Sequence, residues 1–263
     1  MAFNKNELIL DKVRSLTAHD LESDKMLLRL TSLEDSSLNT TAEGEEIVDS
    51  IGALITTLYR AKKATFSASN SLISLDLAAA QYGTKKQVAD GTTKVLDCAY
   101  ETIKIEDGAT SVKLKHEPIV ESIKWIYIIE NNEVGEAFEV GAAASEKMAV
   151  VADDGTITLP TSVTKGKVYV EYDFENENAV QIVNKASEFP EAVKVIIYAY
   201  FRDVCNENKV YSGKIICPKA KLNPESVELS LTSTGKHPFE FVVNRDYCAE
   251  EGEDELFRII VSE

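Results

Sequence analysis

Cysteine is the side chain in this sequence best suited to act as a nucleophile, a metal ligand or a cross-link. No two of the four cysteines have the C-x-x-C spacing of a zinc site, and no closely spaced histidine pair accompanies them. We therefore expect no metal site and interpret the cysteines as small buried residues on strands. A cross-link formed after the protein leaves the cell is the alternative, because Cys205 and Cys217 flank a predicted hairpin. The four residues are Cys98, Cys205, Cys217 and Cys248.

Histidine could supply a general base, but His19, His116 and His237 lie far apart in the sequence. We interpret His116 and His237 as surface or turn residues, because the first lies at a polar strand end and the second precedes a proline. The sequence contains no glycine-rich phosphate loop, no H-E-x-x-H motif and no G-x-S-x-G motif. It predicts a protein that is not an enzyme and that needs no cofactor.

A run of acidic residues at positions 250–255 has the composition of a calcium site. It lacks the D-x-[DN]-x-[DN]-G frame that calcium loops use to place their oxygen ligands. We interpret it as a solvated loop between two strands.

The net charge argues against a protein that grips nucleic acid. The 263 residues include 28 Lys and Arg and 44 Asp and Glu, so the formal charge is −16. Binding to phosphates depends on neutralisation by Lys and Arg. Hydrophobic residues make up 44% of the chain, which is typical of a folded protein of one to three domains. The longest uncharged apolar run, residues 195–201, is too short to span a membrane, and the N-terminal residues lack the apolar stretch of a secretory signal.

The charge also divides the chain into three segments. Residues 1–90 carry 10 basic and 13 acidic residues, residues 91–177 carry 8 and 17, and residues 178–263 carry 10 and 14, for net charges of −3, −9 and −4. Residues 84–93 are polar and turn-rich, and we interpret them as a crossing into a separate unit. We expect 1–90 and 178–263 to form one discontinuous domain, with 91–177 inserted into it.

Most of the sequence alternates with the period of two that is typical of strands. In the first segment we predict strands at residues 26–33, 51–59 and 64–68, and a polar loop at residues 34–46. For residues 70–83 we favour a helix that Asn70 caps and Gly83 ends. A strand is the alternative there, because apolar and polar residues alternate over the first half of this stretch.

The middle and last segments differ in the kind of strand that they contain. The middle segment has short strands separated by turn signals, which is typical of a small β-sandwich. Its predicted strands lie at residues 102–106, 112–115, 123–129, 156–160 and 167–173. The last segment has longer strands, and the strand at 193–201 is apolar on both faces, so we expect both faces to be covered. Further strands are predicted at residues 210–217, 227–231, 239–243 and 256–261.

The two outer segments resemble phage major tail tube proteins. In the first segment the resemblance lies in residues 52–83 (GALITTLYRAKKATFSASNSLISLDLAAAQYG). In the last segment it lies in residues 216–222 (ICPKAKL), 227–236 (VELSLTSTGK), 238–241 (PFEF) and 256–261 (LFRIIV). The middle segment resembles the immunoglobulin-like insertions that such virion proteins carry. The resemblance implies a mainly β fold: a tail-tube β-barrel or sandwich with one flanking α-helix, plus an inserted Ig-like β-sandwich.

The same resemblance implies a structural role. Tail tube subunits form rings of six that stack into a tube, and this tube is the conduit for genome delivery into the host. The implied location is the virion, after assembly in the host bacterial cytoplasm. The implied partners are other copies of the chain, the tail sheath, the tape-measure protein and the tail terminator, with DNA passing through the lumen without specific binding. No catalytic, cofactor or metal-binding residue is carried over, and no membrane span is expected.

Contacts between subunits are the functional sites that the resemblance implies. We expect residues 34–50 to become ordered only between rings, because they form a long segment with few core residues of their own. The strand at 193–201 would place one face on its own helix and the other on a neighbouring subunit. The interface candidates are Leu38, Ile47, Ile51, Ile55, Tyr59, Ile197, Tyr198 and Tyr200. The alternative function is another non-enzymatic virion component, such as a capsid decoration or adhesion protein.

Overall fold

The structure is a computed structural model, and its fold is mainly β. The structure describes residues 7–130, 133–204, 206–225, 227–229, 232, 235–246 and 255–262. The chain divides into two compact units, the first comprising residues 1–86 and 182–263 and the second residues 87–181. The expectation of a mainly β protein with one flanking α-helix is confirmed for the part of the chain that the structure describes.

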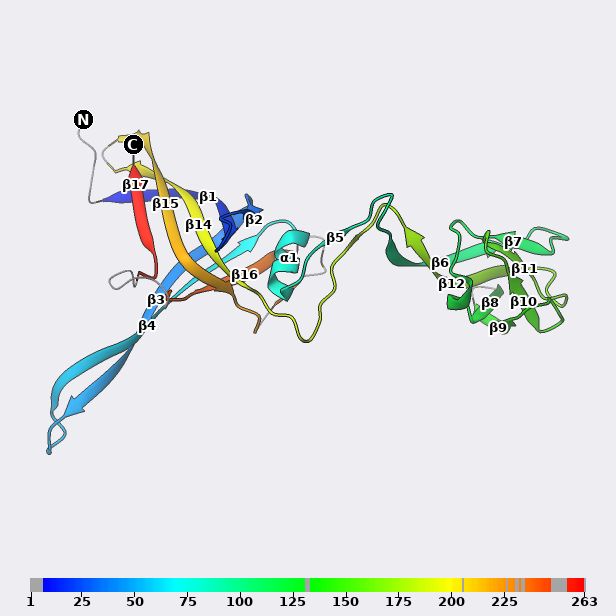
Figure 1. Cartoon of the computed structure of the whole chain (residues 1–263), viewed down its shortest axis with the longest axis horizontal. Coiled ribbons are helices and arrows are strands. Elements are labelled where there is room, and N and C mark those ends of the chain that lie inside the picture. Colours follow the sequence, from blue (N-terminus) through cyan, green and yellow to red (C-terminus); the bar gives the residue numbers. More distant parts are fainter. Residues whose placement is uncertain are drawn as a thin grey trace. The chain divides into compact units, whose positions relative to one another are not determined.

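Unit 1 is built on one large antiparallel sheet (Figure 1). The strand order is β2-β1-β14-β15-β16-β4-β3, and β17 pairs with β15 beyond the end of β16. The sheet curves enough to bring β1 close to β3. Its strands are β1 (Leu8–Asp20), β2 (Met26–Leu30), β3 (Leu33–Val48), β4 (Leu54–Asn70), β14 (Ala192–Asp203), β15 (Asn206–Leu222), β16 (His237–Val243) and β17 (Arg258–Ser262).

One face of this sheet packs against the helix α1 (Leu75–Tyr82). Leu77 of α1 is fully buried among side chains from five or more strands, which include Leu16, Phe66, Ile197 and Phe241. The helix begins where the hydroxyl of Ser74 accepts a hydrogen bond from the backbone N–H of Leu77 (3.2 Å). These contacts fix α1 over what we call the core face of the sheet.

Unit 2 has a hydrophobic core of its own. Seven strands lie in the order β6-β12-β8-β9-β10-β11-β7, and a short pair of strands, β5 (Gln87–Val88) and β13 (Val180–Gln181), stands where the chain enters and leaves the unit. The core is formed by Ile126, Phe138, Ile157, Val168 and Val170 with their neighbours. The other elements are β6 (Val95–Lys104), β7 (Ser111–Lys113), the 3-10 helix η1 (Val120–Ser122), β8 (Trp125–Glu130), β9 (Glu133–Val140), β10 (Met148–Val151), β11 (Thr156–Thr158) and β12 (Lys167–Asn176).

The expected polar loop at residues 34–46 is wrong. These residues belong to β3, which pairs with β4 along almost its whole length. Most of β3 is exposed on both sides, so the alternation that reveals a half-buried strand is absent from its sequence. The two strands predicted at 51–59 and 64–68 are likewise one strand, β4.

The helix prediction is confirmed in kind and corrected at its start. Asn70 is the last residue of β4, and Ser74 takes the capping role that was assigned to it. The helix ends as expected at Gly83, whose φ of +69° places it in the left-handed region. A Cβ there would lie 2.2 Å from the backbone carbonyl carbon of Phe189, so only glycine fits.

Besides β3, the strands β1, β5, β9, β10 and β13 were not expected. Of the strand predicted at residues 227–231, the described residues 227–229 are not in a strand, and the rest lies outside the described residues. Most of the acidic run at 250–255 also lies outside them. The strand at 193–201 is confirmed as part of β14, but only one of its faces is fully covered within the chain.

Candidate assembly surfaces

The β3–β4 hairpin extends beyond the strands that flank it (Figure 1). On its other edge β4 pairs with β16 only from Ala64 to Asn70. We call residues 33–41 and 63–70 the hairpin base and residues 43–60 the hairpin tip. The two parts meet at a β-bulge, where Thr41 pairs with Lys63 and Glu43 pairs with Arg60.

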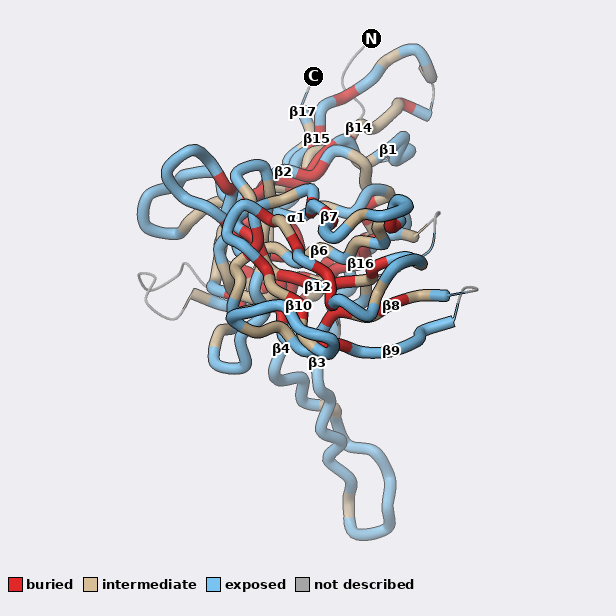
Figure 2. Tube along the Cα trace, turned by 90° about the vertical axis from the view of Figure 1, so that its right-hand side faces the viewer, coloured by how far each residue is buried: buried red, intermediate tan, exposed pale blue. Residues whose placement is uncertain are grey.

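Almost all residues of the hairpin tip are exposed (Figure 2), and several of them are large and apolar. Ile51 is 87% exposed, Tyr59 75% and Ile55 65%. The other large apolar residues exposed on the tip are Ile47, Val48, Leu54 and Leu58. Contiguous apolar surface of this kind marks an interaction site in a soluble protein.

Local contacts shape the tip without covering it. The carboxylate of Asp49 accepts hydrogen bonds from the backbone N–H groups of Ile51 (3.0 Å) and Ala53 (2.8 Å), which closes the turn. Gly44 pairs with Tyr59, and a Cβ on Gly44 would lie 3.4 Å from the tyrosine ring. The tip is therefore a strand pair with a hydrogen-bonded turn, and none of its residues is buried.

Ion pairs near the bulge are exposed and weak in water. Glu45 and Arg60 lie 3.2 Å apart, and Glu43 and Lys63 lie 2.9 Å apart. The hydrogen bond from Lys63 lowers the pKa of the Glu43 carboxyl below its ordinary value. These pairs bridge the two strands but do not cover the apolar residues.

A second uncovered surface lies on the sheet of unit 1, on the side opposite the core face. We call this side of β2, β1, β14, β15 and β17 the outer face. On β14 the core face carries Val195, Ile197 and Ala199, so the alternate residues Tyr198 and Tyr200 lie on the outer face and are half-buried. The Arg14 guanidinium lies 5.6 Å from the centre of the Tyr200 ring.

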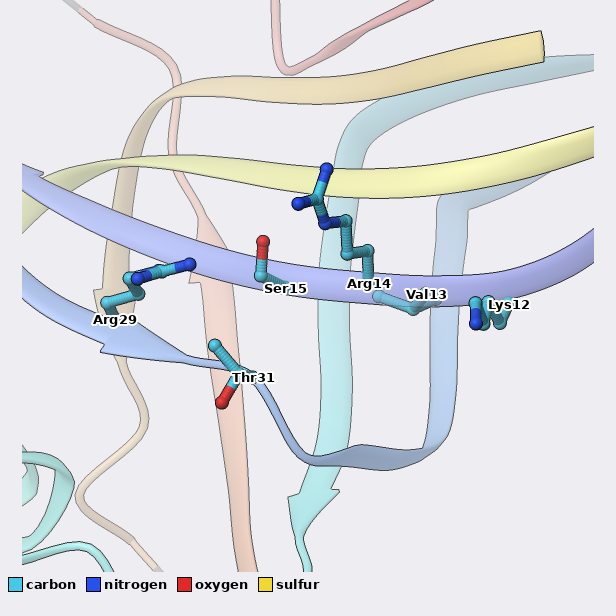
Figure 3. A pocket seen from close by; sticks show the side chains of 6 residues that line it. All are labelled: Lys12, Val13, Arg14, Ser15, Arg29 and Thr31. Carbon is cyan, nitrogen blue, oxygen red and sulfur yellow. The ribbon is translucent and has the colours of Figure 1, made fainter. Parts of the chain in front are cut away.

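The outer face is rich in basic side chains. Three of them are paired with carboxylates: Lys194 with Asp24 (2.9 Å), Arg202 with Asp11 (2.9 Å) and Arg258 with Glu255 (3.1 Å). Four others, Lys12, Arg14, Arg29 and Lys214, form no ion pair within 4 Å among the described residues, although Lys12 also interacts electrostatically with Asp11. A cavity of about 340 Å³ is lined by Lys12, Val13, Arg14, Ser15, Arg29 and Thr31 (Figure 3).

The structure separates the predicted interface residues into three groups. Ile47, Ile51, Ile55 and Tyr59 lie on the exposed hairpin tip, and Leu38 lies on the base, where it packs partly against the core. Tyr198 and Tyr200 lie on the outer face. Ile197 is 0% exposed in the core of unit 1, so it is not on a surface of the chain.

The interpretation of His237 as a surface or turn residue is wrong. His237 is the first residue of β16 and is fully buried. Its Nε2 lies 2.6 Å from the Oε1 atom of Gln81, and its Nδ1 accepts a hydrogen bond from the backbone N–H of Ser74 (3.3 Å). Burial lowers the pKa of this imidazole below its ordinary value. His237 therefore connects α1 and the residue before it to the sheet. A turn was predicted here because a proline follows His237 in the sequence.

His116 is half-buried beside a strand of unit 2. Its ring stacks on Phe174 with the ring centres 4.2 Å apart. No group of three or more His, Cys, Asp or Glu side chains that could hold a metal ion is found in the described part of the chain.

Two of the four cysteines fall within the described residues, and both are free thiols. Cys217 is buried opposite Val195, and burial raises its pKa to about 11. Cys98 lies on β6 as expected but is exposed, so the interpretation of all four as buried is wrong for this residue. Cys205 and Cys248 lie outside the described residues, and Cys217, the other half of the predicted cross-link, is a free thiol in this structure.

Sequence reasoning named Tyr198 and Tyr200 on the outer face but missed its basic residues. Its basic residues come from segments up to about 240 positions apart, and only the strand pairing of β1, β2, β14, β15 and β17 brings them together. The signal that could have found them is the spacing of Lys12, Arg14 and Arg29 in an otherwise acidic chain.

No helix in the described residues is long and apolar enough to cross a membrane.

Comparison with known families gives one match that spans most of the chain. The model of the YomU/Tube protein family matches residues 8–249. This range takes in β1 to β16, and so includes the hairpin, α1 and all of unit 2. No curated protein matches the chain.

Proposed function

The chain belongs to the YomU/Tube protein family, a family of phage tube proteins, and from this premise we propose that it is the repeating subunit of a phage tail tube. The proposal is that six copies form a ring and that rings stack into the conduit for genome delivery. The single observation that carries it is the hairpin tip, where apolar residues are exposed on a strand pair that no element of the described residues covers.

The tip suits a contact between rings. A contact that joins two different patches on identical chains repeats without closing, and so builds an open filament. The hairpin tip of one ring, seated on the body of the next, is a contact of this kind. Burying Ile51, Ile55 and Tyr59 there would gain about 1.5–3 kcal/mol for each side chain that becomes fully covered.

The sheet of unit 1 supplies edges for contacts within a ring. Its order leaves β2 and β3 at the two ends, and β17 lies outside β15. Unpaired edge strands carry free N–H and C=O groups that readily pair with another chain. Joining such edges between six copies would turn six curved sheets into one closed barrel.

Unit 2 is proposed to be the Ig-like insertion. Its support is a seven-stranded sheet around a separate core, inserted between two halves of unit 1. Residues 91–177 carry 8 basic and 17 acidic residues, a net charge of −9. A module of this charge is best solvated, so its proposed place is the outside of the tube. The proposed location of the whole protein is the virion, after assembly in the host cytoplasm, and its further proposed partners are the sheath, tape-measure and terminator proteins.

Electron microscopy of the purified protein tests the assembly. At about 0.1 M salt the Debye length is about 10 Å, which weakens the mutual repulsion of subunits of charge −16. We expect rings or striated tubes with a central channel. Discrete small oligomers would instead favour a decoration or adhesion protein.

A double variant identifies the contact that makes the tube. I51S/I55S removes the two most exposed isoleucines of the tip and is expected to leave rings or single chains without stacked tubes. The matched control L96S/V134S changes two exposed apolar residues of unit 2 and should still form tubes. Tubes of normal length from I51S/I55S would contradict the proposed role of the tip.

A further inference from the structure

We infer that the outer face of unit 1 is a phosphate-binding surface that contacts the backbone of nucleic acid inside the tube. This inference deepens the proposed function and rests on it for the source of the nucleic acid. The observation behind it is a basic surface on a chain whose net charge is −16.

The bulges of β1 concentrate charge on this face. The register of β1 against β14 shifts between Leu10 and Lys12 and again between Val13 and Ser15, so Asp11 and Arg14 are extra residues in the strand. A bulge re-aims the side chain that it carries. Arg14 therefore lies over Tyr200 on the outer face, next to Lys12 and Ser15 rather than opposite them.

The cavity at this point is lined by hydrogen-bond donors of the kind that phosphate accepts. Arg14 and Ser15 extend from the same side of β1, and the Arg29 guanidinium of β2 reaches toward them (Figure 3). Lys12 adds an ammonium group and Thr31 a hydroxyl to the lining, and no carboxylate lines it. Guanidinium groups bind phosphate oxygens through two hydrogen bonds, and hydroxyls add positioning contacts.

The rest of the outer face continues the surface across neighbouring strands. Lys12 pairs with Tyr200, which pairs with Ser212, and in the next row Ser15, Tyr198 and Lys214 follow one another in the same way. Since neighbouring strands lie about 4.8 Å apart, β2, which carries Arg29, and β15, which carries Lys214, are roughly 14 Å apart. That length of duplex carries roughly eight phosphate charges. The spread of the cations therefore fits a polymer of phosphates better than one small anion.

Sequence-independent contact suits a conduit. Lys12, Arg14, Arg29 and Lys214 meet phosphates without reading bases, so DNA can move from one set of contacts to the next. The acidic remainder of the chain limits the affinity. Weak, salt-dependent contact is thus the expected behaviour, and it is distinct from the specific binding that the net charge argues against.

Fluorescence anisotropy with a labelled duplex of random sequence tests the inference. The probe is added to unassembled full-length protein between 50 and 200 mM salt. If the four free cations each neutralise one phosphate, the plot of log affinity against log salt has a slope of about −3.6. The triple variant K12Q/R14Q/R29Q should lose about 2.7 of that slope and at least about tenfold in affinity at 50 mM salt.

The control variant K124Q/K147Q/K165Q carries the same change in net charge. Its three lysines are exposed on unit 2, and it should bind the duplex as the unchanged protein does. Equal losses in the two triple variants, or no binding by the unchanged protein at 50 mM salt, would overturn the inference. A polyglutamate peptide that displaces the probe as well as unlabelled DNA does would also overturn it, in favour of an acidic protein surface.

Microscopy of the same preparations separates this inference from the proposed function. Tubes that form from protein without affinity for the duplex overturn the inference alone. Binding that depends on Lys12, Arg14 and Arg29 supports the inference at the level of the single chain, even where no tube forms. Inorganic phosphate at millimolar concentration should compete only weakly with the labelled duplex. Complete displacement of the duplex by phosphate would overturn the inference, because it would show that the surface is a site for a single anion.

Discussion

The base and the tip of the β3–β4 hairpin belong to the same two strands but have opposite surroundings. In the base, β4 buries every second residue from Ala64 to Asn70, with Phe66 only 2% exposed. In the tip, no residue of β4 is buried, although its apolar residues are as large as those of the base. The base is thus stabilised by its own chain, whereas no described residue covers the large apolar residues of the tip. The difference indicates that the partner of the tip is another molecule.

The largest effect should come from truncating the base. Phe66→Ala leaves a cavity beside Phe239, whose ring centre lies 6.3 Å from that of Phe66, and should destabilise unit 1 by about 3–5 kcal/mol. Tyr59→Ala, at the 75% exposed tip, should change stability by less than about 0.5 kcal/mol. Calorimetry measures both variants. Trp125, the one tryptophan, lies in unit 2, so its fluorescence shows whether that unit still unfolds as before. Equal losses in the two variants would mean that the tip is part of the core.

A moderate effect should follow from acidification, through the buried end of the base. His237 pairs with Asn70 in the register of β16 and β4. Because burial lowers the pKa of His237, the unfolded chain takes up a proton at this site at a higher pH than the folded chain. The stability that the neutral imidazole contributes is therefore present above about pH 6.5 and is lost as the pH falls through the lowered pKa.

Two variants isolate this effect in melting temperatures measured between pH 7 and pH 5.5. His237→Gln removes the titration and should flatten the dependence on pH, which for one proton is at most about 1.4 kcal/mol per pH unit. Gln81→Glu places a carboxylate next to Nε2, which favours the protonated ring and should also reduce the loss. An unchanged dependence in both variants would assign the acid sensitivity to other groups.

The smallest effect is expected at the junction of base and tip. Ala61 has a φ of +48°, a left-handed conformation that costs a residue with a Cβ about 1–2 kcal/mol. Ala61→Gly relieves this strain but adds freedom to the unfolded chain, so a gain below about 1 kcal/mol is expected in thermal unfolding. Ala53→Gly, in the turn of the tip, is the control and should give no gain. Destabilisation by Ala61→Gly would show that the bulge is not strained.

The same contrast explains which parts of the fold could be predicted from the sequence. β14 was found because residues 195–201 form an unbroken apolar run. The structure shows which of them are buried, namely Val195, Ile197 and Ala199. β3 was missed because a strand with two wet faces shows no alternation. β1 was missed for another reason: the bulges at Asp11 and Arg14 place consecutive residues on one face and break the period of two.

The candidate sites were predictable to a similar extent. Ile51, Ile55 and Tyr59 were predicted as interface residues on a strand, and the structure exposes all three. Ile197 was named with Tyr198 because the sequence does not say which face of β14 is the core, and a shift of one residue exchanges the two faces. The outer face depends on pairings between strands nearly 200 positions apart, such as Lys12 with Tyr200, and local pattern holds no record of them.

The way in which unit 2 is attached has an evolutionary consequence. Val88 and Val180 form one pair of the short β5–β13 ladder, so the chain leaves unit 1 and returns to it at neighbouring points about 5 Å apart. A gap of this size closes with a two-residue turn. The whole module can therefore be gained, lost or exchanged by recombination without rethreading a single strand of the tube-forming sheet. Under the proposed function, exchange of this module would change what each subunit displays and would leave the sheet of unit 1 unchanged.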